Sequence, residues 1–149
     1  MKEITSDRNT IESIIGSASV CRIALSDGGQ PYVVPVCFGY ADNTLYFHSA
    51  PRGRKLDVLR ENNAVCFEFD VDHEIVRSED ACKWSMKYRS VVGFGRAFLV
   101  EDLEEKRGAL DVIMSHYGGK PYAYPEATLR KTAVVRVEIH SMTGKTSGY

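Results

Sequence analysis

Within the segment Ala64–Asp72, apolar and acidic side chains alternate along the chain. In an extended chain, a period of two places the apolar side chains on one face and the acidic side chains on the other, as in a strand with one buried face. The alternating residues are Phe67, Phe69 and Val71 against Glu68, Asp70 and Asp72. The same period returns in Ala133–His140, near the end of the chain. These segments predict a mainly β fold.

Further strands and a few short helices are expected in the rest of the chain. The strands are expected at residues 20–26, 30–40, 44–49, 64–72, 86–100 and 133–140, with loops at 73–83 and 120–125. Helices are expected after a cap at Ser6 or Asp7, at residues 54–62, and after a cap at Asp102.

Two tight turns set the topology of the first strands. Asp27-Gly28-Gly29 and Ala41-Asp42-Asn43 join the first three strands into an antiparallel meander. Because the strands do not alternate with helices in a βαβ rhythm, the pattern predicts an antiparallel β-barrel of six or seven strands with short helices packed outside. The length suits one domain over residues 1–149.

The charge balance excludes several classes of partner. The 149 residues carry 19 Lys and Arg against 20 Asp and Glu, which gives a net charge of -1. A chain this close to neutral has no global attraction for nucleic acid or for an anionic membrane, so a bound anion must be held by a local cluster of bases. The N-terminal residues are charged and no apolar run could span a bilayer, which predicts a cytoplasmic protein.

No metal site or disulfide is expected. The four cysteines include no CxxC pair, and the histidines lack ligand spacing. The chain also lacks the GxGxxG, Walker and GxSxG motifs. Rossmann dinucleotide binding, nucleotide hydrolysis and serine hydrolase chemistry therefore have no support in the sequence.

The bases Arg52, Arg54 and Lys55 crowd the first turn of the helix expected at residues 54–62. A helix dipole is positive at this end and disfavours cations by about 0.3–1 kcal/mol each. The helix after Asp102 begins instead with acidic residues, the favourable sign. A bound phosphate would resolve the conflict, because free N–H groups and bases would converge on it. The alternative is a solvated basic corner.

Several other residues are further candidates for a ligand site. His48 and Ser49 end the strand that leads into the basic turn, where Ser49 can donate to an anion and His48 can act as acid, base or hydrogen-bond partner; a purely structural His48 is the alternative. Pro35 removes a hydrogen-bond donor from its strand, so it marks an edge, a bulge or a place where a ligand faces the backbone. The rings of Trp84, Tyr88 and Phe94 could stack on a planar ligand or pack in the core or a subunit interface.

Taken in order, these segments resemble the pyridoxamine 5'-phosphate oxidase-like FMN-binding split-barrel proteins, and within them the nitroimidazole-resistance (NimA-type) branch. The resembling segments cover nearly the whole chain and are residues 28–38, 45–50, 53–56, 82–95 and 142–145.

The resemblance implies a split β-barrel homodimer that holds FMN in two clefts at the subunit interface. The backbone of Val33, Val34, Pro35 and Val36 would pass along the flavin, and His48 and Ser49 would contact it, with His48 facing the reaction site. Arg54 and Lys55 would bind the FMN phosphate. Arg89 and Ser90 would reach the flavin across the dimer.

The expected activity is reduction of a small substrate, such as a nitroimidazole, by electrons from the flavin. The alternative is a non-catalytic flavin carrier or sensor, or a haem-handling protein on the same barrel. Relatives that oxidise pyridoxamine phosphate are longer and carry an Arg-x-His element near the C-terminus. No such element occurs near Lys145, which argues against vitamin B6 oxidation.

Overall fold

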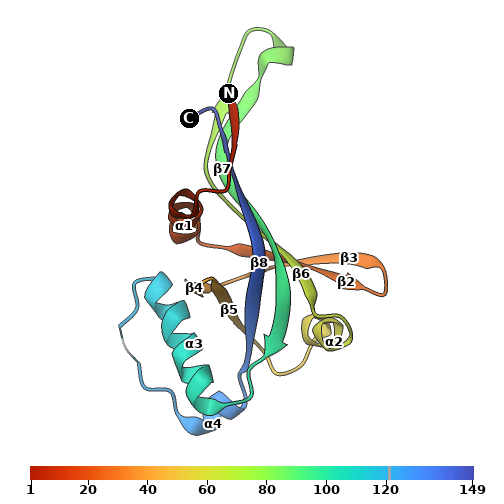
Figure 1. Ribbon diagram of the computed structural model, residues 1–149, viewed down its shortest axis with the longest axis vertical. Coiled ribbons are helices and arrows are strands. Elements are labelled where there is room, and N and C mark those ends of the chain that lie inside the picture. Colours follow the sequence, from red (N-terminus) through yellow and green to blue (C-terminus); the bar gives the residue numbers. More distant parts are fainter. Residues whose placement is uncertain (121) are drawn as a thin grey trace.

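The computed structural model describes residues 1–120 and 122–149, which form an antiparallel sheet of eight strands curved into a split barrel, with helices outside (Figure 1). The strands are β1 (Lys2–Thr5), β2 (Cys21–Asp27), β3 (Gln30–Val36), β4 (Gly39–Ala41), β5 (Thr44–Ser49), β6 (Ala64–Val76), β7 (Ser85–Leu99) and β8 (Ala133–Ser147). The helices are α1 (Arg8–Ser17), α2 (Arg54–Glu61), α3 (Leu103–His116) and α4 (Glu126–Arg130), and a 3-10 turn covers Ala81–Lys83.

The strands follow the order β3-β2-β6-β7-β8-β5-β4, and β1 lies beside the distal part of β8. The expected mainly β antiparallel architecture is confirmed. The described strands number eight rather than six or seven for two reasons. The N-terminal β1 was not expected, and the strand expected at residues 30–40 is divided into β3 and β4.

The division between β3 and β4 occurs where the chain meets α3. The Phe38 ring is buried against Phe69, with 4.8 Å between ring centroids. The Phe38 N–H donates to the hydroxyl of Tyr117, just after α3, over 3.1 Å, rather than to a neighbouring strand. A side chain from outside the sheet thus satisfies the backbone and ends the strand.

Close backbone packing fixes the centre of the barrel, where β7 crosses the buried aromatic rings of β6. A Cβ atom added to Gly93 would lie 2.2 Å from the ring of Phe67, so only glycine fits. The pairing of β7 with β8 shifts by one residue between Phe94 and Gly95, which is a β-bulge. The two glycines therefore mark a close backbone approach at Gly93 and a β-bulge at Gly95.

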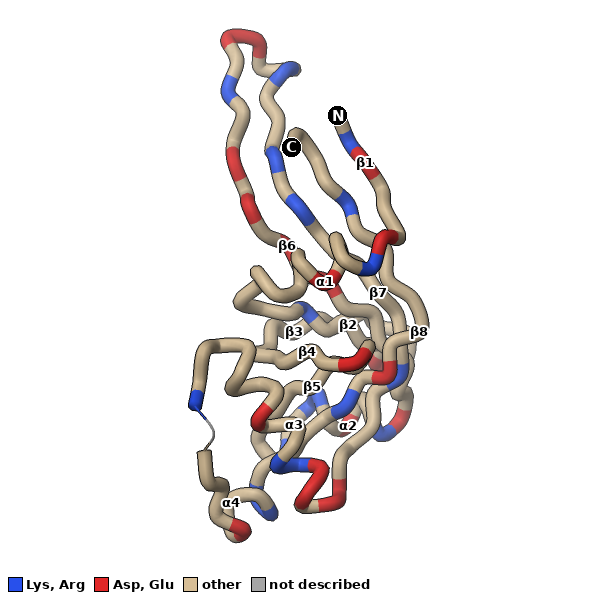
Figure 2. The backbone as a smooth tube through the Cα atoms, turned by 60° about the vertical axis from the view of Figure 1, so that its left-hand side comes forward, with Lys and Arg blue, Asp and Glu red and all other residues tan. Residues whose placement is uncertain are grey.

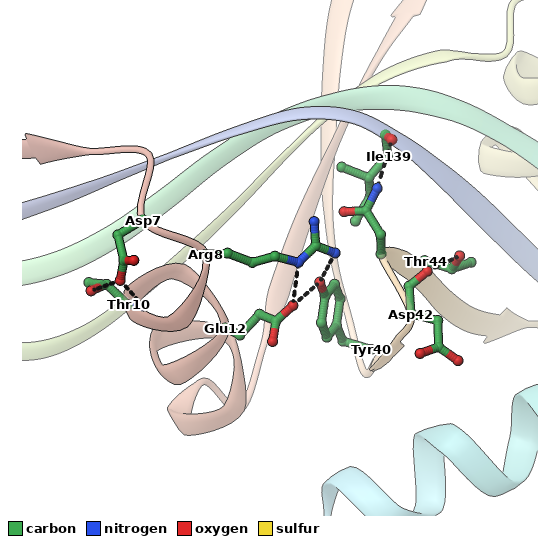
Figure 3. A network of polar contacts seen from close by, with 9 residues as sticks. Asp7, Arg8, Thr10, Glu12, Tyr40, Asp42, Thr44 and Ile139 are labelled. Atoms are coloured by element: carbon green, nitrogen blue, oxygen red, sulfur yellow. Dashed lines mark hydrogen bonds and ion pairs between the residues drawn. The ribbon is translucent and has the colours of Figure 1, made fainter.

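Helix α1 begins as expected and is attached to β4 by polar contacts (Figure 3). The Asp7 carboxylate caps it by accepting the Thr10 N–H over 2.8 Å. On the side facing β4, Glu12 accepts from Arg8 over 2.9 Å and from the Tyr40 hydroxyl over 3.0 Å (Figure 3). The cap at Asp102 on α3 is also confirmed, because Asp102 accepts the Glu105 N–H over 2.9 Å.

Strands β6 and β7 continue beyond the barrel as a hairpin, residues 72–87, which we call the β6–β7 arm (Figure 1). The loop expected at 73–83 is therefore wrong in its first part, because residues up to Val76 pair with β7. A bulge separates the arm from the barrel, and Asp72 there has a φ of 58°. Basic and acidic residues are interspersed along the arm, so its surface carries no single sign of charge (Figure 2).

Two features of the second half of the chain complete the fold. The loop expected at 120–125 includes residue 121, which lies outside the described residues, and α4 follows residues 122–125 directly.

The Lys106 side chain of α3 is buried and donates to the carbonyl oxygens of Leu129 and Thr132, each over 2.9 Å, which attaches α4 to α3. Within the described residues, none of the helices has the length and apolar content needed to cross a bilayer.

Candidate functional site

The start of α2 carries a concentration of basic charge without a side-chain cap. Its N-cap residue is Gly53, with a φ of 147° that favours glycine, and in the described part of the chain no side chain caps this helix start. In α3, by contrast, the Asp102 carboxylate fills that role. Helix α2 and the basic residues at its start are where the sequence predicts them.

Arg54 is engaged by the hairpin between β2 and β3. Its Nε and Nη2 atoms each lie 3.0 Å from Oδ2 of Asp27, at the end of β2. Its guanidinium also lies over the ring of Tyr32 on β3, 4.1 Å from the ring centroid. The base that the sequence assigns to a phosphate is therefore held by a carboxylate and an aromatic face within the same chain.

Lys55 lies in a different environment from Arg54. Its side chain is half-buried, and its Nζ atom lies 5.6 Å from the ring centroid of Phe47 on β5. Burial lowers the pKa of the Lys55 ammonium group. In the described part of the chain no carboxylate offsets that cost. An anion bound beside Lys55 would stabilise its charged form.

His48 and Ser49 lie at the end of β5, directly before the basic turn. His48 is exposed and lies opposite Val134 of β8. Ser49 is half-buried, and its hydroxyl donates to the carbonyl oxygen of Ala50 over 2.9 Å. Because the His48 side chain is exposed, His48 is not a core residue.

The start of α2 connects β3 with the end of β5. Arg54 lies over the ring of Tyr32 on β3, 4.1 Å from the ring centroid, and Lys55 lies 5.6 Å from the ring centroid of Phe47 on β5. The Val33–Val36 segment, His48, Ser49, Arg54 and Lys55 therefore belong to one region of the subunit.

The segment Val33–Val36 lies at an edge of the sheet, because among the described residues β3 pairs with β2 alone. Pro35 therefore removes a donor where no strand needs it, and the edge interpretation is confirmed. Val33 and Pro35 are exposed on the outer face of the sheet, where Val33 keeps 60% of its surface. Val34 is half-buried and Val36 is buried, so the side chain of Val36 is not available to a ligand.

Arg89 and Ser90 lie far from His48 within the subunit. Along β8, Val134 is opposite His48 and Thr146 is opposite Arg89. At about 3.3 Å per residue, the intervening strand spans roughly 40 Å. One subunit therefore does not bring Arg89 and Ser90 together with His48.

The Arg89 side chain is held at the base of the β6–β7 arm. Its Nη1 atom donates to Oδ2 of Asp72 over 2.6 Å. Its guanidinium lies 4.1 Å from the ring centroid of Tyr149, whose hydroxyl donates to the carbonyl oxygen of Asp72 over 2.6 Å. Tyr149 and Asp72 therefore both contact the Arg89 side chain and hold it in place.

Of the aromatic residues considered for stacking, Tyr88 is half-buried, whereas Trp84 and Phe94 are on the surface. Trp84 keeps 51% of its surface exposed and Phe94 keeps 55%, so the core alternative is wrong for both. The indole N–H of Trp84 donates to the carbonyl oxygen of Ser78 over 2.7 Å, which fixes the ring at the tip of the arm.

The sequence did not single out Asp27 or Tyr32. Asp27 was assigned only to a turn and Tyr32 only to a strand, because local patterns do not show which distant side chain a turn meets. The signal available in the sequence was the carboxylate of Asp27 in the turn, in a chain whose bases Arg52, Arg54 and Lys55 cluster further on.

Comparison with known proteins finds a family model and solved structures that are similar to this chain. The family model described as pyridoxamine 5'-phosphate oxidase matches residues 7–146. A crystal structure of a candidate 5-nitroimidazole antibiotic resistance protein from Bacteroides thetaiotaomicron is 41% identical, covers 98% of this chain and 87% of that one, and has a TM-score of 0.88.

More distant similarities show the fold alone. The FAD and heme binding protein from Mycobacterium smegmatis is 20% identical with a TM-score of 0.89, over 98% of this chain and 74% of that one. The flavocytochrome Anf3 from Azotobacter vinelandii is 22% identical with a TM-score of 0.83, over 98% and 70%. An uncharacterised protein of Rhizobium meliloti is 31% identical over 61 residues, so the match spans 41% of this chain and 40% of that relative.

Proposed function

The chain belongs to the pyridoxamine 5'-phosphate oxidase family, and from this premise we propose that it binds a flavin, FMN, beside the start of α2. The Lys55 environment carries this proposal. A half-buried ammonium group with a lowered pKa and no offsetting carboxylate among the described residues is stabilised by an anion. The uncapped N–H groups at the start of α2 favour the same ligand, so the chemistry of the residues fits a phosphate.

We infer that the flavin site forms between two copies of the chain. His48, Arg54 and Lys55 would come from one copy, and Arg89 and Ser90 from the other, because a single subunit keeps His48 and Arg89 roughly 40 Å apart along β8. A homodimer brings two such halves together by symmetry, since each copy contributes both surfaces.

The outer face of the sheet offers an apolar surface for this association. Val33 pairs with Ala24 of β2, which pairs with Cys66 of β6, which pairs with Phe94 of β7, so the four residues form one row across the sheet. Val33 and Phe94 are 60% and 55% exposed. A second copy would remove this row from water, which favours association.

We propose that the protein is an oxidoreductase for a small substrate, with nitroaromatic compounds as the substrate class. Bound FMN would supply the electron or hydride transfer. The residues of the chain would bind the phosphate, orient the ring along Val33–Val36 and hold a proton at the imidazole of His48. The exposure of His48 at the strand end beside the proposed phosphate site supports its role at the reaction centre.

The absorption spectrum of the purified protein tests the cofactor first. We expect flavin bands, and release of FMN rather than FAD on denaturation, identified by mass spectrometry. A colourless protein that binds neither added FMN nor FAD would contradict the flavin proposal, and a Soret band would favour a haem-handling protein. Steady oxidation of NADH or NADPH in the presence of a nitro compound then separates an enzyme from a flavin carrier.

A further inference from the structure

The hairpin between β2 and β3 contributes two contacts to one base. Asp27 Oδ2 accepts a hydrogen bond from Nε of Arg54 over 3.0 Å, and Nη2 of Arg54 lies 3.0 Å from the same oxygen as an ion pair. Tyr32, on the opposite strand of the same hairpin, places its ring 4.1 Å from the guanidinium carbon. One edge and one face of the Arg54 side chain are therefore occupied within the chain.

Within the described residues, several donors of Arg54 are left for a ligand. A guanidinium group carries five N–H donors; Asp27 accepts the one on Nε and forms an ion pair with Nη2. Neither N–H group of Nη1 has a hydrogen-bond partner in this part of the chain. This set matches a phosphate, whose oxygens accept paired N–H donors from a guanidinium group.

The pair of Arg54 and Asp27 has little value for stability alone. The two side chains are 54% and 42% exposed, and ion pairs at such exposure contribute between about 0 and 1 kcal/mol to folding. The pair matters more for the conformation of the Arg54 side chain than for folding stability, because an exposed arginine otherwise samples many rotamers. Restricting these before the ligand arrives lowers the entropic cost of binding.

We propose that Asp27 and Tyr32 are positioning residues, which hold the Arg54 guanidinium at the start of α2 with its Nη1 donors left for the phosphate of the flavin. This rests on the proposed FMN site. The two bases then have different roles. Arg54 is fixed by its neighbours, whereas Lys55 has no ion-pair partner among the described residues.

The test compares FMN with riboflavin, which lacks the phosphate. The ratio of their dissociation constants measures the phosphate contacts and is insensitive to a general loss of stability. In Asp27→Asn, we expect the preference for FMN over riboflavin to fall by about tenfold, because Arg54 loses its fixed orientation. Asp57→Asn is the matched control: it removes a carboxylate from α2 that pairs with Arg60 over 3.4 Å, and should leave the ratio within about twofold.

Two variants at position 32 separate the ring from the hydroxyl. Tyr32→Phe keeps the ring over Arg54 and should keep the FMN preference, whereas Tyr32→Leu should reduce it. Thermal unfolding of each variant establishes that it is folded.

The outcomes distinguish the two levels of the proposal. If Asp27→Asn increases the preference for FMN, Asp27 competes with the phosphate, and the positioning role is overturned; an unchanged ratio overturns it as well. If the wild-type protein binds riboflavin as tightly as FMN, or binds neither, the proposed phosphate site itself fails.

Discussion

The Oδ2 atom of Asp27 lies 3.0 Å from both Nε and Nη2 of Arg54 and so joins residues that are 27 positions apart in the sequence. This contact connects the β2–β3 hairpin to the first residue of α2. It places the hairpin and the helix start, with its two unlike bases, in one candidate site.

Removing both bases tests the phosphate site most directly. We expect Arg54→Ala combined with Lys55→Ala to weaken FMN binding by about 3 kcal/mol or more, because charge-assisted hydrogen bonds contribute about 1.5–3 kcal/mol each. Riboflavin binding should change little. Fluorescence titration measures both, and Arg60→Ala, on the same helix, is the control. An FMN affinity equal to that of the wild type would refute the assignment.

His48→Ala should separate chemistry from binding. The side chain is exposed at the end of β5, so its removal should leave the fold and the FMN affinity nearly unchanged. Turnover of a nitro compound should fall by about 100-fold if the imidazole transfers a proton. His140→Ala, at another exposed histidine, should keep full turnover. Equal turnover in the two variants would exclude a catalytic His48.

Mixing two inactive variants tests whether the site lies between subunits. Light scattering should give a mass of about 33 kDa, twice the 16.7 kDa of the chain. The Arg54→Ala, Lys55→Ala variant retains the Arg89 half of the site, and Arg89→Ala retains the other half. After unfolding together and refolding, hybrid dimers should restore about a quarter of the FMN sites. If mixing restores no binding although hybrids form, both halves of the site belong to one chain.

Glu68 makes stability depend on pH. Burial and the neighbouring Asp70 raise its pKa from 4.5 to about 7, and its Oε1 atom is buried with no hydrogen-bond partner among the described residues. Between these values the folded protein holds a proton that the unfolded chain has released, so stability falls as the pH rises from 4.5 to 7 and stays reduced above. The pKa of Asp70 is lowered by its hydrogen bond with Glu68 and by Arg22, which acts in the opposite sense at lower pH.

Glu68→Gln should therefore stabilise the protein at pH 8 by about 1 kcal/mol, a value reduced because the side chain is partly exposed. Near pH 4 the variant should match the wild type. Urea unfolding at the two pH values gives the difference. Glu74→Gln, which removes an exposed partner of Lys87, provides the control. Equal stabilisation at both pH values would contradict the titration of Glu68.

Two glycine substitutions test the packing of the barrel. Gly93→Ala should destabilise by about 3 kcal/mol, because the new Cβ would lie 2.2 Å from the Phe67 ring. Gly108→Ala on α3 should stabilise by about 0.5–1 kcal/mol, since no atom lies within 4 Å of its Cβ position and alanine favours the helix. Chemical denaturation measures both. A stabilising Gly93→Ala would show that the barrel is less closely packed there.

Local signals predicted much of the fold. The caps at Asp7 and Asp102 and the strand Thr44–Ser49 are where the sequence places them, because their causes lie within a few residues. Strand β1 and the start of the β6–β7 arm were missed. Their residues become strands through pairing with β8 and β7, and a polar segment gives no sign of its distant partner.

The candidate site follows the same division. The bases at the start of α2 were found because they break a local electrostatic rule. The Asp27 contact with Arg54 was missed because it depends on how the hairpin folds toward the helix. The wide separation of Arg89 from His48 was equally beyond local patterns, since it is set by the length of β8.

The continuous course of β8 has a consequence for communication within the proposed dimer. The same strand lies opposite His48 near one end and opposite Arg89 near the other. Each copy of β8 would thus run from one flavin to the other, and ordering of the strand by the first ligand would alter the entropy left for the second. Cooperativity between the two flavins, rather than independent filling, is the behaviour to expect from such a connection.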